Sequence, residues 1–343
     1  MKTIWHPTRS GANPRHRQRG LTLVELMVGL TLGMIMSTAL LVLFANASSN
    51  GQNVHRASAH IENGRYATEL LRDELQMSGY YGEASSGVGS YVTPDACLTD
   101  PAGAFVAAPL SYPTPVRGYT ASETIACLGA YSRLAGTDAV AVRRLDVQSV
   151  AVSTLPATGQ QYHLQHSLCI NDPANTPLVF DKNRAAFTLQ MRNCTAPNTV
   201  RPYISRLYFV AGCSRCGTSG DSIHTLKRLD LVGNTLVETA LVEGVESFRL
   251  EYGFDTDGDG SPDSWRTSAA VVGPASQWEN VMAITIHMIV RSTERVTGAS
   301  LARAQTFQLG RLGGVYTAND GFARRAYSST VRLINPSGAR EAQ

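Results

Sequence analysis

The longest apolar segment of the chain runs from Leu21 to Phe44, and Glu25 is its only charged residue. A helix needs roughly 20 apolar residues to span the hydrocarbon core of a bilayer, so this segment predicts a transmembrane helix. A carboxylate inside such a helix costs about 2.5–3.5 kcal/mol on insertion scales, so Glu25 indicates a functional interaction. The alternative is a signal anchor that tolerates one glutamate near its end.

The same helix is predicted to continue beyond the membrane, because no proline interrupts residues 45–77. Apolar or small side chains recur there at helical spacing, which predicts an amphipathic half-helix packed on a globular head. These positions are Val54, Ala57, Ile61, Thr68, Leu71 and Leu75. Gly51 and Gly64 each lower helix propensity by about 1 kcal/mol relative to alanine, which predicts a kink or local softening. The helix is expected to end near Ser78 and Gly79.

The rest of the chain, residues 79–343, is predicted to form one β-rich head of about 265 residues. Residues 79–136 contain many prolines and predict a long loop region rather than a central sheet. Strand-like alternation follows at 139–152, 187–191, 204–210, 236–242, 245–252 and 331–334. Residues 281–290 are almost continuously apolar, which predicts a buried central strand. The fold class is therefore α+β.

Charge is concentrated at the N-terminus. Residues 1–20 carry Lys2, Arg9, Arg15, Arg17 and Arg19 and no acid, a charge of +5, whereas the whole chain carries +3. The remainder is therefore close to −2, and the overall pI of 8.5 does not indicate a nucleic-acid partner. The positive-inside rule places residues 1–20 in the cytoplasm and the chain beyond Phe44 outside the inner membrane, with a single pass.

The position of Gly20 separates two kinds of signal. An ordinary secretory signal has an apolar region of 7–15 residues followed by its cleavage site, whereas Gly20 precedes a longer apolar run. Gly20-Leu21-Thr22-Leu23-Val24-Glu25 resembles the type III, prepilin-type signal of type IV pilins and pseudopilins. This resemblance implies that a prepilin peptidase cleaves after Gly20 and methylates Leu21, although most members have Phe or Met at that position. It also implies that Glu25 pairs with the N-terminal amine of a neighbouring subunit.

Three further segments narrow the resemblance. Residues 71–82, residues 245–253 with the Asp-rich loop after them, and residues 324–333 resemble PilW-type minor pilins. The resemblance implies a type IV pilin-like fold and a minor pilin that helps to initiate pilus assembly in a tip priming complex. Other minor and major pilins and a large tip adhesin are the implied partners. The protein is then expected in the inner membrane before assembly and in the pilus or its tip afterwards.

All six cysteines lie beyond Phe44, on the exported side of the membrane. An even number of cysteines in an oxidising compartment predicts disulfides, and six cysteines allow 15 pairings. The expected pairing joins neighbours: Cys97–Cys127, Cys169–Cys194 and Cys213–Cys216. The last pair has the spacing of a redox CxxC motif, but it follows a strand-like run instead of opening a helix. This context favours a small hairpin staple.

An acidic segment carries the strongest ligand signal. Asp255, Asp257, Asp259, Ser261 and Asp263 occupy positions 1, 3, 5, 7 and 9 of an EF-hand-like calcium loop, with glycine at position 6. Arg266 stands at position 12, where such loops have a bidentate glutamate, so any affinity is expected in the weak range of about 10⁻⁴–10⁻³ M. The alternative is an ordinary Asp-Gly turn.

Catalytic motifs are missing from the sequence, which argues against an enzyme. His163 and His166 are three residues apart in an expected strand and therefore point to opposite faces. Two competing functions remain at this level: a minor pseudopilin of a type II secretion system, and a membrane-tethered periplasmic enzyme. The large head with its acidic loop favours the pilin over the pseudopilin.

Overall fold

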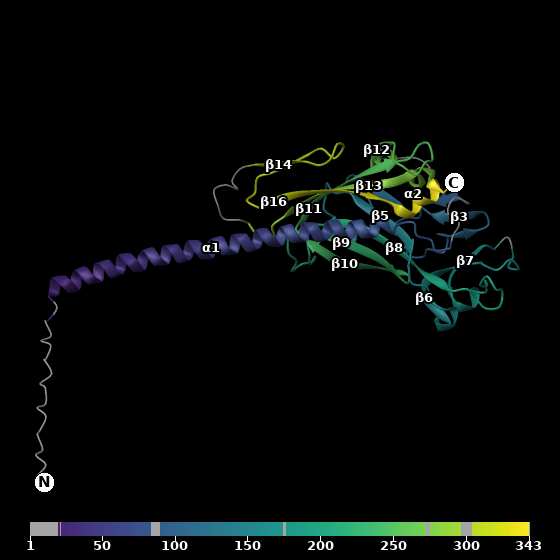
Figure 1. The fold of residues 1–343 in the computed structure, drawn as a ribbon, viewed down its shortest axis with the longest axis horizontal. Helices are drawn as coiled ribbons and strands as arrows, with labels where there is room; N and C mark the ends of the chain where they lie inside the picture. The colour runs from purple at the N-terminus through teal and green to yellow at the C-terminus, as the bar shows by residue number, and fades with distance from the viewer. Residues whose placement is uncertain are drawn as a thin grey trace, which may run out of the picture. The chain divides into compact units, whose positions relative to one another are not determined.

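The computed structural model describes residues 20, 22–83, 90–173, 176–271, 275–295 and 304–342. The chain forms two compact units, Met1–Val54 and His55–Gln343. Helix α1 (Leu23–Gln76) contributes its first part to the first unit and its second part to the second (Figure 1). The basic leader up to Arg19, together with Leu21, lies outside the described residues.

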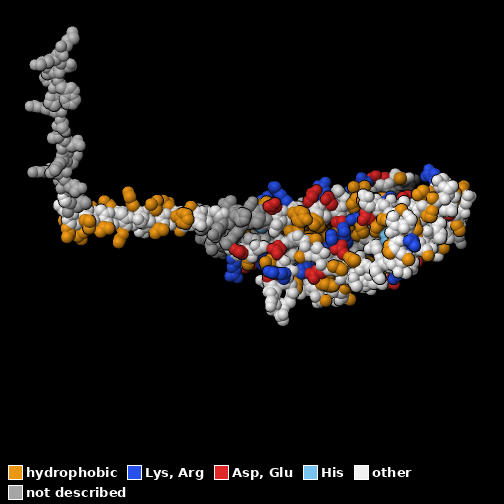
Figure 2. All heavy atoms as spheres, turned by 90° about the horizontal axis from the view of Figure 1, so that it is seen from below, with side chains coloured by type: hydrophobic (Ala, Val, Ile, Leu, Met, Phe, Trp, Pro, Cys, Tyr) orange, Lys and Arg blue, Asp and Glu red, His pale blue; other side chains and the backbone are white. Residues whose placement is uncertain are grey.

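The first unit is described as a helix that is apolar all round. Leu23–Ser48 has a mean hydropathy of 2.2 over 26 residues, which is long and apolar enough to cross a membrane. Its apolar side chains are exposed and are distributed along the visible face of this segment (Figure 2). The hydroxyl groups of Thr31 and Thr38 donate to the carbonyl oxygens of Val28 and Met34, as polar groups in lipid must find partners within the helix.

The second unit begins with the remaining turns of α1, which have one buried face. Ala67, Leu71 and Leu75 are at most 1% exposed, and their spacing of four residues places them on one side of the helix. The helix continues without a break at Gly64, so this glycine does not end it. Gly64 instead makes room for the ring of Tyr327, which a Cβ would overlap. The Tyr327 hydroxyl donates to the carbonyl oxygen of Ile61 at 3.0 Å.

Two sheets form most of the head. The larger has seven strands, with β10-β9-β8-β5-β4 along its main path, while β6 pairs with β7 and β8. Its strands are β4 (Val116–Tyr119), β5 (Ala139–Leu145), β6 (Thr158–His166), β7 (Leu178–Asn183), β8 (Val200–Ala211), β9 (Thr225–Val232) and β10 (Thr235–Glu243). The second sheet has the order β12-β11-β13-β16. It contains β11 (Val245–Phe254), β12 (Ser264–Thr267), β13 (Val281–Arg291) and β16 (Arg324–Arg332). The predicted central strand is thus β13, which pairs with β11 and β16.

Smaller elements complete the head. They are the three-stranded sheet of β1 (Ser90–Val92), β2 (Val106–Ala107) and β3 (Leu110–Pro113), the hairpin of β14 (Gln305–Gln308) and β15 (Val315–Ala318), and helix α2 (Ile334–Glu341). Short 3-10 turns occur at Ala126–Tyr131, Val152–Thr154, Arg184–Ala186, Ser268–Val271 and Ala275–Asn280.

One hydrophobic cluster joins the helix to both large sheets. Leu71 and Leu75 of α1 share it with Tyr208 of β8, Ile284 of β13 and Val331 of β16. The amphipathic face of α1 therefore organises the core of the head, as the spacing of its apolar residues predicts. Of the positions predicted for this face, the side chains of Val54 and Ala57 lie outside the described residues.

Several predicted β and loop assignments differ from the structure. The strand predicted at 139–152 ends at Leu145, and the strand predicted at 331–334 ends at Arg332, before α2 begins at Ile334. Residues 79–136 contain β1 to β4 instead of only loop, and β4 closes one edge of the seven-stranded sheet. Proline is tolerated there because it stands at strand ends and edges, where a missing N–H breaks no interior ladder. Residues 187–191 form no strand, although Phe187 and Leu189 are buried. Their apolar alternation reflects packing of an irregular segment.

The six cysteines form three bonds, Cys97–Cys127, Cys169–Cys194 and Cys213–Cys216. This is the neighbour pairing expected from the sequence. The Cα atoms of the three pairs are 5.0–5.4 Å apart, within the normal range for disulfides.

Candidate functional site

The first candidate site lies at the start of α1. Gly20 is exposed, and none of the described atoms outside its immediate neighbours lies within 4 Å of the position that a Cβ would take. The fold itself therefore does not require glycine at this position. Leu21, the predicted methylation site, lies outside the described residues.

Glu25 lies in the first turn of α1 and closes a reciprocal cap with Thr22. The Thr22 backbone N–H and hydroxyl donate to Glu25 Oε2, both at 3.0 Å, and the Glu25 N–H donates to Thr22 Oγ1 at 3.3 Å. This is the capping-box arrangement of a Thr followed three residues later by a Glu. It was readable in the sequence as Thr22-x-x-Glu25, and it gives Glu25 a partner within the subunit.

The second candidate site is the acidic loop between β11 and β12, residues 255–263. Asp255 is 1% exposed and accepts the N–H groups of Gly258 at 2.6 Å and Gly260 at 2.9 Å. Gly258 and Gly260 have φ values of +91° and +84°, which favour glycine. A Cβ on Gly260 would also stand 2.6 Å from the Ser337 carbonyl oxygen, so the loop curls tightly against α2.

The loop brings together part of the predicted ligand set. One carboxylate oxygen from each of Asp255, Asp257 and Asp263 lies within 4.8 Å of the other two. Asp259 is not part of this group, and its Oδ1 accepts the N–H of Ser261 at 2.6 Å. At position 12 of the calcium-loop pattern, the Arg266 guanidinium lies 4.6 Å from the centre of the Phe254 ring and adds no oxygen ligand.

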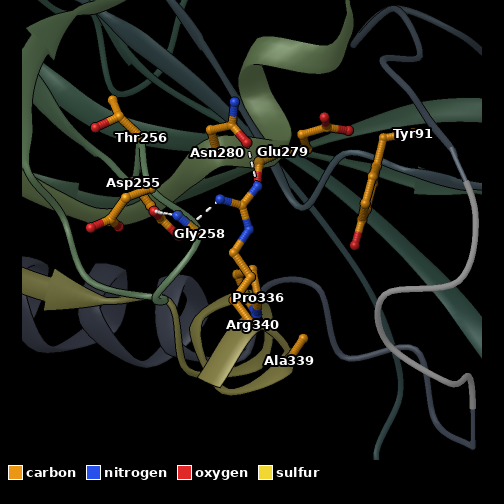
Figure 3. Close-up of a pocket in the computed structure, with 10 residues that line it drawn as sticks. Tyr91, Asp255, Thr256, Gly258, Glu279, Asn280, Pro336, Ala339 and Arg340 are labelled. Carbon is orange, nitrogen blue, oxygen red and sulfur yellow. Dashed lines mark hydrogen bonds and ion pairs between the residues drawn. The ribbon is translucent and has the colours of Figure 1, made fainter. Parts of the chain in front are cut away.

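A basic residue that the sequence pattern did not indicate reaches the same loop. Arg340 of α2 donates to Asp255 Oδ2 at 2.8 Å and also contacts the side-chain oxygen of Asn280. Figure 3 shows the guanidinium extending between these two groups, with the Tyr91 ring on the far side of a pocket. The pocket has a volume of about 410 Å³. Arg340 lies 85 residues from Asp255, and nothing in the local pattern of either segment links them.

These contacts set the charge of the site. Burial would raise the pKa of Asp255, but the Arg340 guanidinium and the N–H groups of Gly258 and Gly260 outweigh burial and hold that pKa below its ordinary value. Hydrogen bonds from the Thr256 N–H and hydroxyl likewise lower the pKa of Asp263. Burial raises the pKa of Glu279, and Arg340 opposes that rise. Asp255 and Asp263 are therefore carboxylates at neutral pH.

The three gathered carboxylates fit a hard cation in size. Two oxygens bound to one calcium at 2.3–2.6 Å are at most about 5.2 Å apart, and the three oxygens here meet that limit at 4.8 Å. Arg340 already neutralises Asp255, so a cation would share that carboxylate with the guanidinium or displace it. Asp255, Asp257 and Asp263 are thus the residues of this loop that would hold the ion.

Two protein-family models match this chain, and one of them covers the start of α1. Residues 207–335 match the family model of type IV pilus-assembly protein W, and residues 15–41 match the prokaryotic N-terminal methylation motif. The first match runs from β8 to the beginning of α2 and includes the acidic loop. The second contains Gly20, Leu21 and Glu25. Together they confirm the resemblance to PilW-type minor pilins with a prepilin signal.

Among solved structures, the chain is similar to the type IV-like pilin TTHA1219 from Thermus thermophilus. The two are 12% identical, with a TM-score of 0.32, over 81% of this chain and 97% of that chain. No curated protein matches the sequence. The two family matches, to a pilus-assembly protein and to a methylation motif, indicate a structural protein related to type IV pilins.

Proposed function

We propose that this pilin is a minor subunit that initiates assembly of a type IV pilus, within a priming complex of minor pilins at the tip. The match of residues 207–335 to type IV pilus-assembly protein W carries this proposal, because it concerns the head and not only the shared signal. A prepilin signal alone would suit a pseudopilin equally well. Other minor and major pilins, and a large tip adhesin, are the proposed partners.

The exposed first part of α1 supports an assembly role. Its apolar side chains are uncovered within the chain, as for Met34 at 72% and Phe44 at 75% exposed, so lipid or neighbouring helices must cover them. The protein is proposed to sit in the inner membrane with a cytoplasmic N-terminus until neighbouring pilin helices replace the lipid.

Glu25 supplies the proposed register between subunits. After cleavage, the new α-amine has a reference pKa of about 7.7–8 and is mostly charged at neutral pH. A lone charge in lipid is costly, whereas an ion pair between the amine and Glu25 satisfies both groups. Before assembly the Thr22 cap satisfies Glu25. As the subunit enters the growing pilus, Glu25 would then exchange its hydrogen bonds to Thr22 for an ion pair with a neighbour's amine.

The acidic loop is proposed to bind calcium weakly. The convergence of Asp255, Asp257 and Asp263 supports this proposal, while Arg340 on Asp255 predicts that the affinity is lower than the loop alone would give. Calcium would stabilise the loop against α2. Prepilin peptidase is the remaining proposed partner, acting after Gly20 and methylating Leu21.

A complementation experiment tests the assembly role. Cells lacking the protein receive wild-type, Glu25→Ala or Thr22→Val chains, and pili are counted and measured by electron microscopy. Glu25→Ala is expected to insert and to be cleaved but to leave few pili. Thr22→Val removes the hydroxyl contacts of the cap and keeps Glu25, so it should retain pili. Normal pilus numbers with Glu25→Ala would contradict the pairing role.

Titrating the expression of the wild-type chain separates an initiator from a bulk subunit. An initiator sets the number of pili and leaves their length unchanged, whereas a bulk subunit limits their length. Shorter pili at constant number would therefore overturn initiation while leaving the pilin role intact. The same count in a retraction-deficient strain shows whether the protein promotes assembly or only opposes retraction.

A further inference from the structure

The Cys213–Cys216 bond differs from the other two disulfides in its surroundings. All six cysteines are described, and Cys216 alone is exposed, whereas Cys213 is 9% exposed. The bond lies in the connection between β8 and β9 and closes a separation of only three residues, compared with 30 and 25 for the other two. Closing a short loop restricts the unfolded chain least, so this bond contributes least to stability by that mechanism.

A buried cation lies next to the sulfur of Cys216. The Lys227 ammonium lies 3.4 Å from Cys216 Sγ, and the Lys227 side chain is 3% exposed. Its carboxylate partner is Glu238 of β10. At the other two disulfides, backbone N–H groups face sulfur: Cys127 N–H donates to Cys97 Sγ at 3.0 Å and Asn171 N–H to Cys169 Sγ at 3.2 Å. A full positive charge beside a sulfur favours its thiolate and therefore the reduced pair.

The connection is held in place independently of the bond. Asp221 accepts the N–H groups of Ser214 at 2.7 Å, Arg215 at 3.1 Å and Ile223 at 3.1 Å. The Ser214 hydroxyl also donates to Glu243 at 2.8 Å. Opening the bond would therefore leave both cysteines close together, so that the bond can form again.

We propose that Cys213–Cys216 is an exchangeable disulfide that reacts with protein dithiols through Cys216, with Lys227 stabilising its reduced form, while the other two disulfides are structural. A thiolate of the reduced dithiol attacks Cys216 Sγ and forms a mixed disulfide. The bond between the two cysteines breaks, and Cys213 leaves as a thiolate that takes a proton from solvent. The second thiol of the partner then attacks the mixed disulfide and releases Cys216 beside Lys227. The partner leaves oxidised to a disulfide, and this chain holds two thiols.

Redox titration of the full chain in detergent tests the proposal. The protein is equilibrated in mixtures of reduced and oxidised glutathione and quenched with acid, and free thiols are labelled with a maleimide and assigned by peptide mass spectrometry. Cys213 and Cys216 are expected to become reduced at about a tenfold less reducing glutathione ratio than the other four cysteines. Reduction of all three bonds together, or only after denaturation, would overturn the proposal.

Variants of the charged pair test the role of Lys227. Lys227→Met is expected to make Cys213–Cys216 about tenfold harder to reduce, because the charge beside the thiolate is lost. Lys227→Arg keeps the charge and should restore most of the effect. Glu238→Gln keeps the lysine and removes its counter-charge, so reduction should become easier. This opposite shift remains informative if Lys227→Met fails to fold. Unchanged titrations in Lys227→Met and Glu238→Gln would remove Lys227 from the proposal.

A pair of cysteine variants tests which sulfur reacts. Cys213→Ala leaves Cys216 free and should form a mixed disulfide with oxidised glutathione at least tenfold faster than Cys216→Ala, which leaves only the buried cysteine. The rates are read from the mass of the intact chain over time. Equal rates, or a faster reaction in Cys216→Ala, would show that exposure and Lys227 do not direct the exchange.

Discussion

The two parts of helix α1 share one secondary structure and differ in where their partners lie. In the first part, apolar side chains such as Leu32 are exposed at 57%, and Glu25 is bonded only to its own cap at Thr22 among the described residues. In the second part, Leu71 is 1% exposed, and Glu74 contacts Arg144 and Arg206 of the head. The head thus covers the apolar face of one part of the helix, whereas the apolar side chains of the other part must be covered by lipid or by further subunits.

This difference shows why helical character alone says little about a helix's role. The apolar residues surround the first part, so no single face is selected for burial within the chain. They form one stripe in the second part, and that stripe selects the core. Both parts carry glutamates, and Glu74 in the second part has two arginine counter-charges within the same molecule.

The largest expected effect is on processing of the first part. Gly20→Leu should abolish leader removal and leave a full-length membrane protein, because the fold does not explain the glycine but a peptidase site does. Electrophoretic mobility against wild type measures this. A Gly29→Ala variant serves as the control, since Gly29 also has no described neighbour within 4 Å of a Cβ. Normal maturation of Gly20→Leu would remove the prepilin interpretation.

The next largest effect is expected when a leucine in the second part of α1, rather than one in the first part, is replaced by alanine. Leu71→Ala should destabilise the head by about 2–5 kcal/mol, because it leaves a cavity in the core cluster. Leu32→Ala makes the same chemical change where the side chain is exposed, and should alter head stability by less than about 0.5 kcal/mol. Chemical unfolding of the full chain in detergent, followed by tryptophan fluorescence, compares them. Equal losses of stability would mean that both parts of α1 contribute equally to the stability of the head.

Glu74 in the second part of α1 predicts that the stability of the head depends on pH. Burial would raise the pKa of Glu74, but Arg206 and Arg144 outweigh it and place that pKa below the ordinary 4.5. Because the folded pKa is depressed, the contribution of Glu74 is complete above about pH 4.5 and is lost as the pH falls through the folded value. Glu74→Gln should cost about 1–3 kcal/mol at pH 7.

The stability curves of wild type and Glu74→Gln are expected to converge below pH 4.5, which unfolding titrations across pH 3–7 would measure. Glu69→Gln, on the exposed face of the same helix, is the matched control and should leave the curve unchanged, since its contact with Arg72 is exposed. A constant difference between wild type and Glu74→Gln at every pH would show that packing, rather than charge, explains the effect.

The smallest effect concerns calcium at the acidic loop. With a dissociation constant near 1 mM, 10 mM calcium would stabilise the head by about 1.4 kcal/mol and raise its melting temperature by roughly 2–5 °C. Asp257→Asn should remove this shift. Asp259→Asn makes the same charge change outside the carboxylate group and should keep it. Arg340→Gln should enlarge the shift, because it frees Asp255.

Differential scanning calorimetry of the full chain in detergent, with calcium and with chelator, measures these shifts. Magnesium should produce a smaller shift, since it demands tighter octahedral geometry. Equal shifts in Asp257→Asn and Asp259→Asn, or no shift in wild type, would leave residues 255–263 as an acidic turn held by Arg340.

The sequence by itself determined those features that depend on neighbouring residues. The length and apolar character of the segment after Gly20 predict the membrane helix, and the spacing of Leu71 and Leu75 predicts the buried face. The continuous apolar run at 281–290 predicts the central strand β13. Periodicity and composition suffice in these cases, because burial of a helix face or of an interior strand is recorded along the chain itself.

Only the tertiary structure decided which distant groups meet. Arg340 reaches Asp255 from α2, Lys227 of β9 faces Cys216, and Tyr327 of β16 fills the space at Gly64. Local sequence shows that each of these residues is charged, small or aromatic, but it does not show what each one faces. Side chains from separate strands meet because the sheets place them together, and that placement depends on the packing of the whole head.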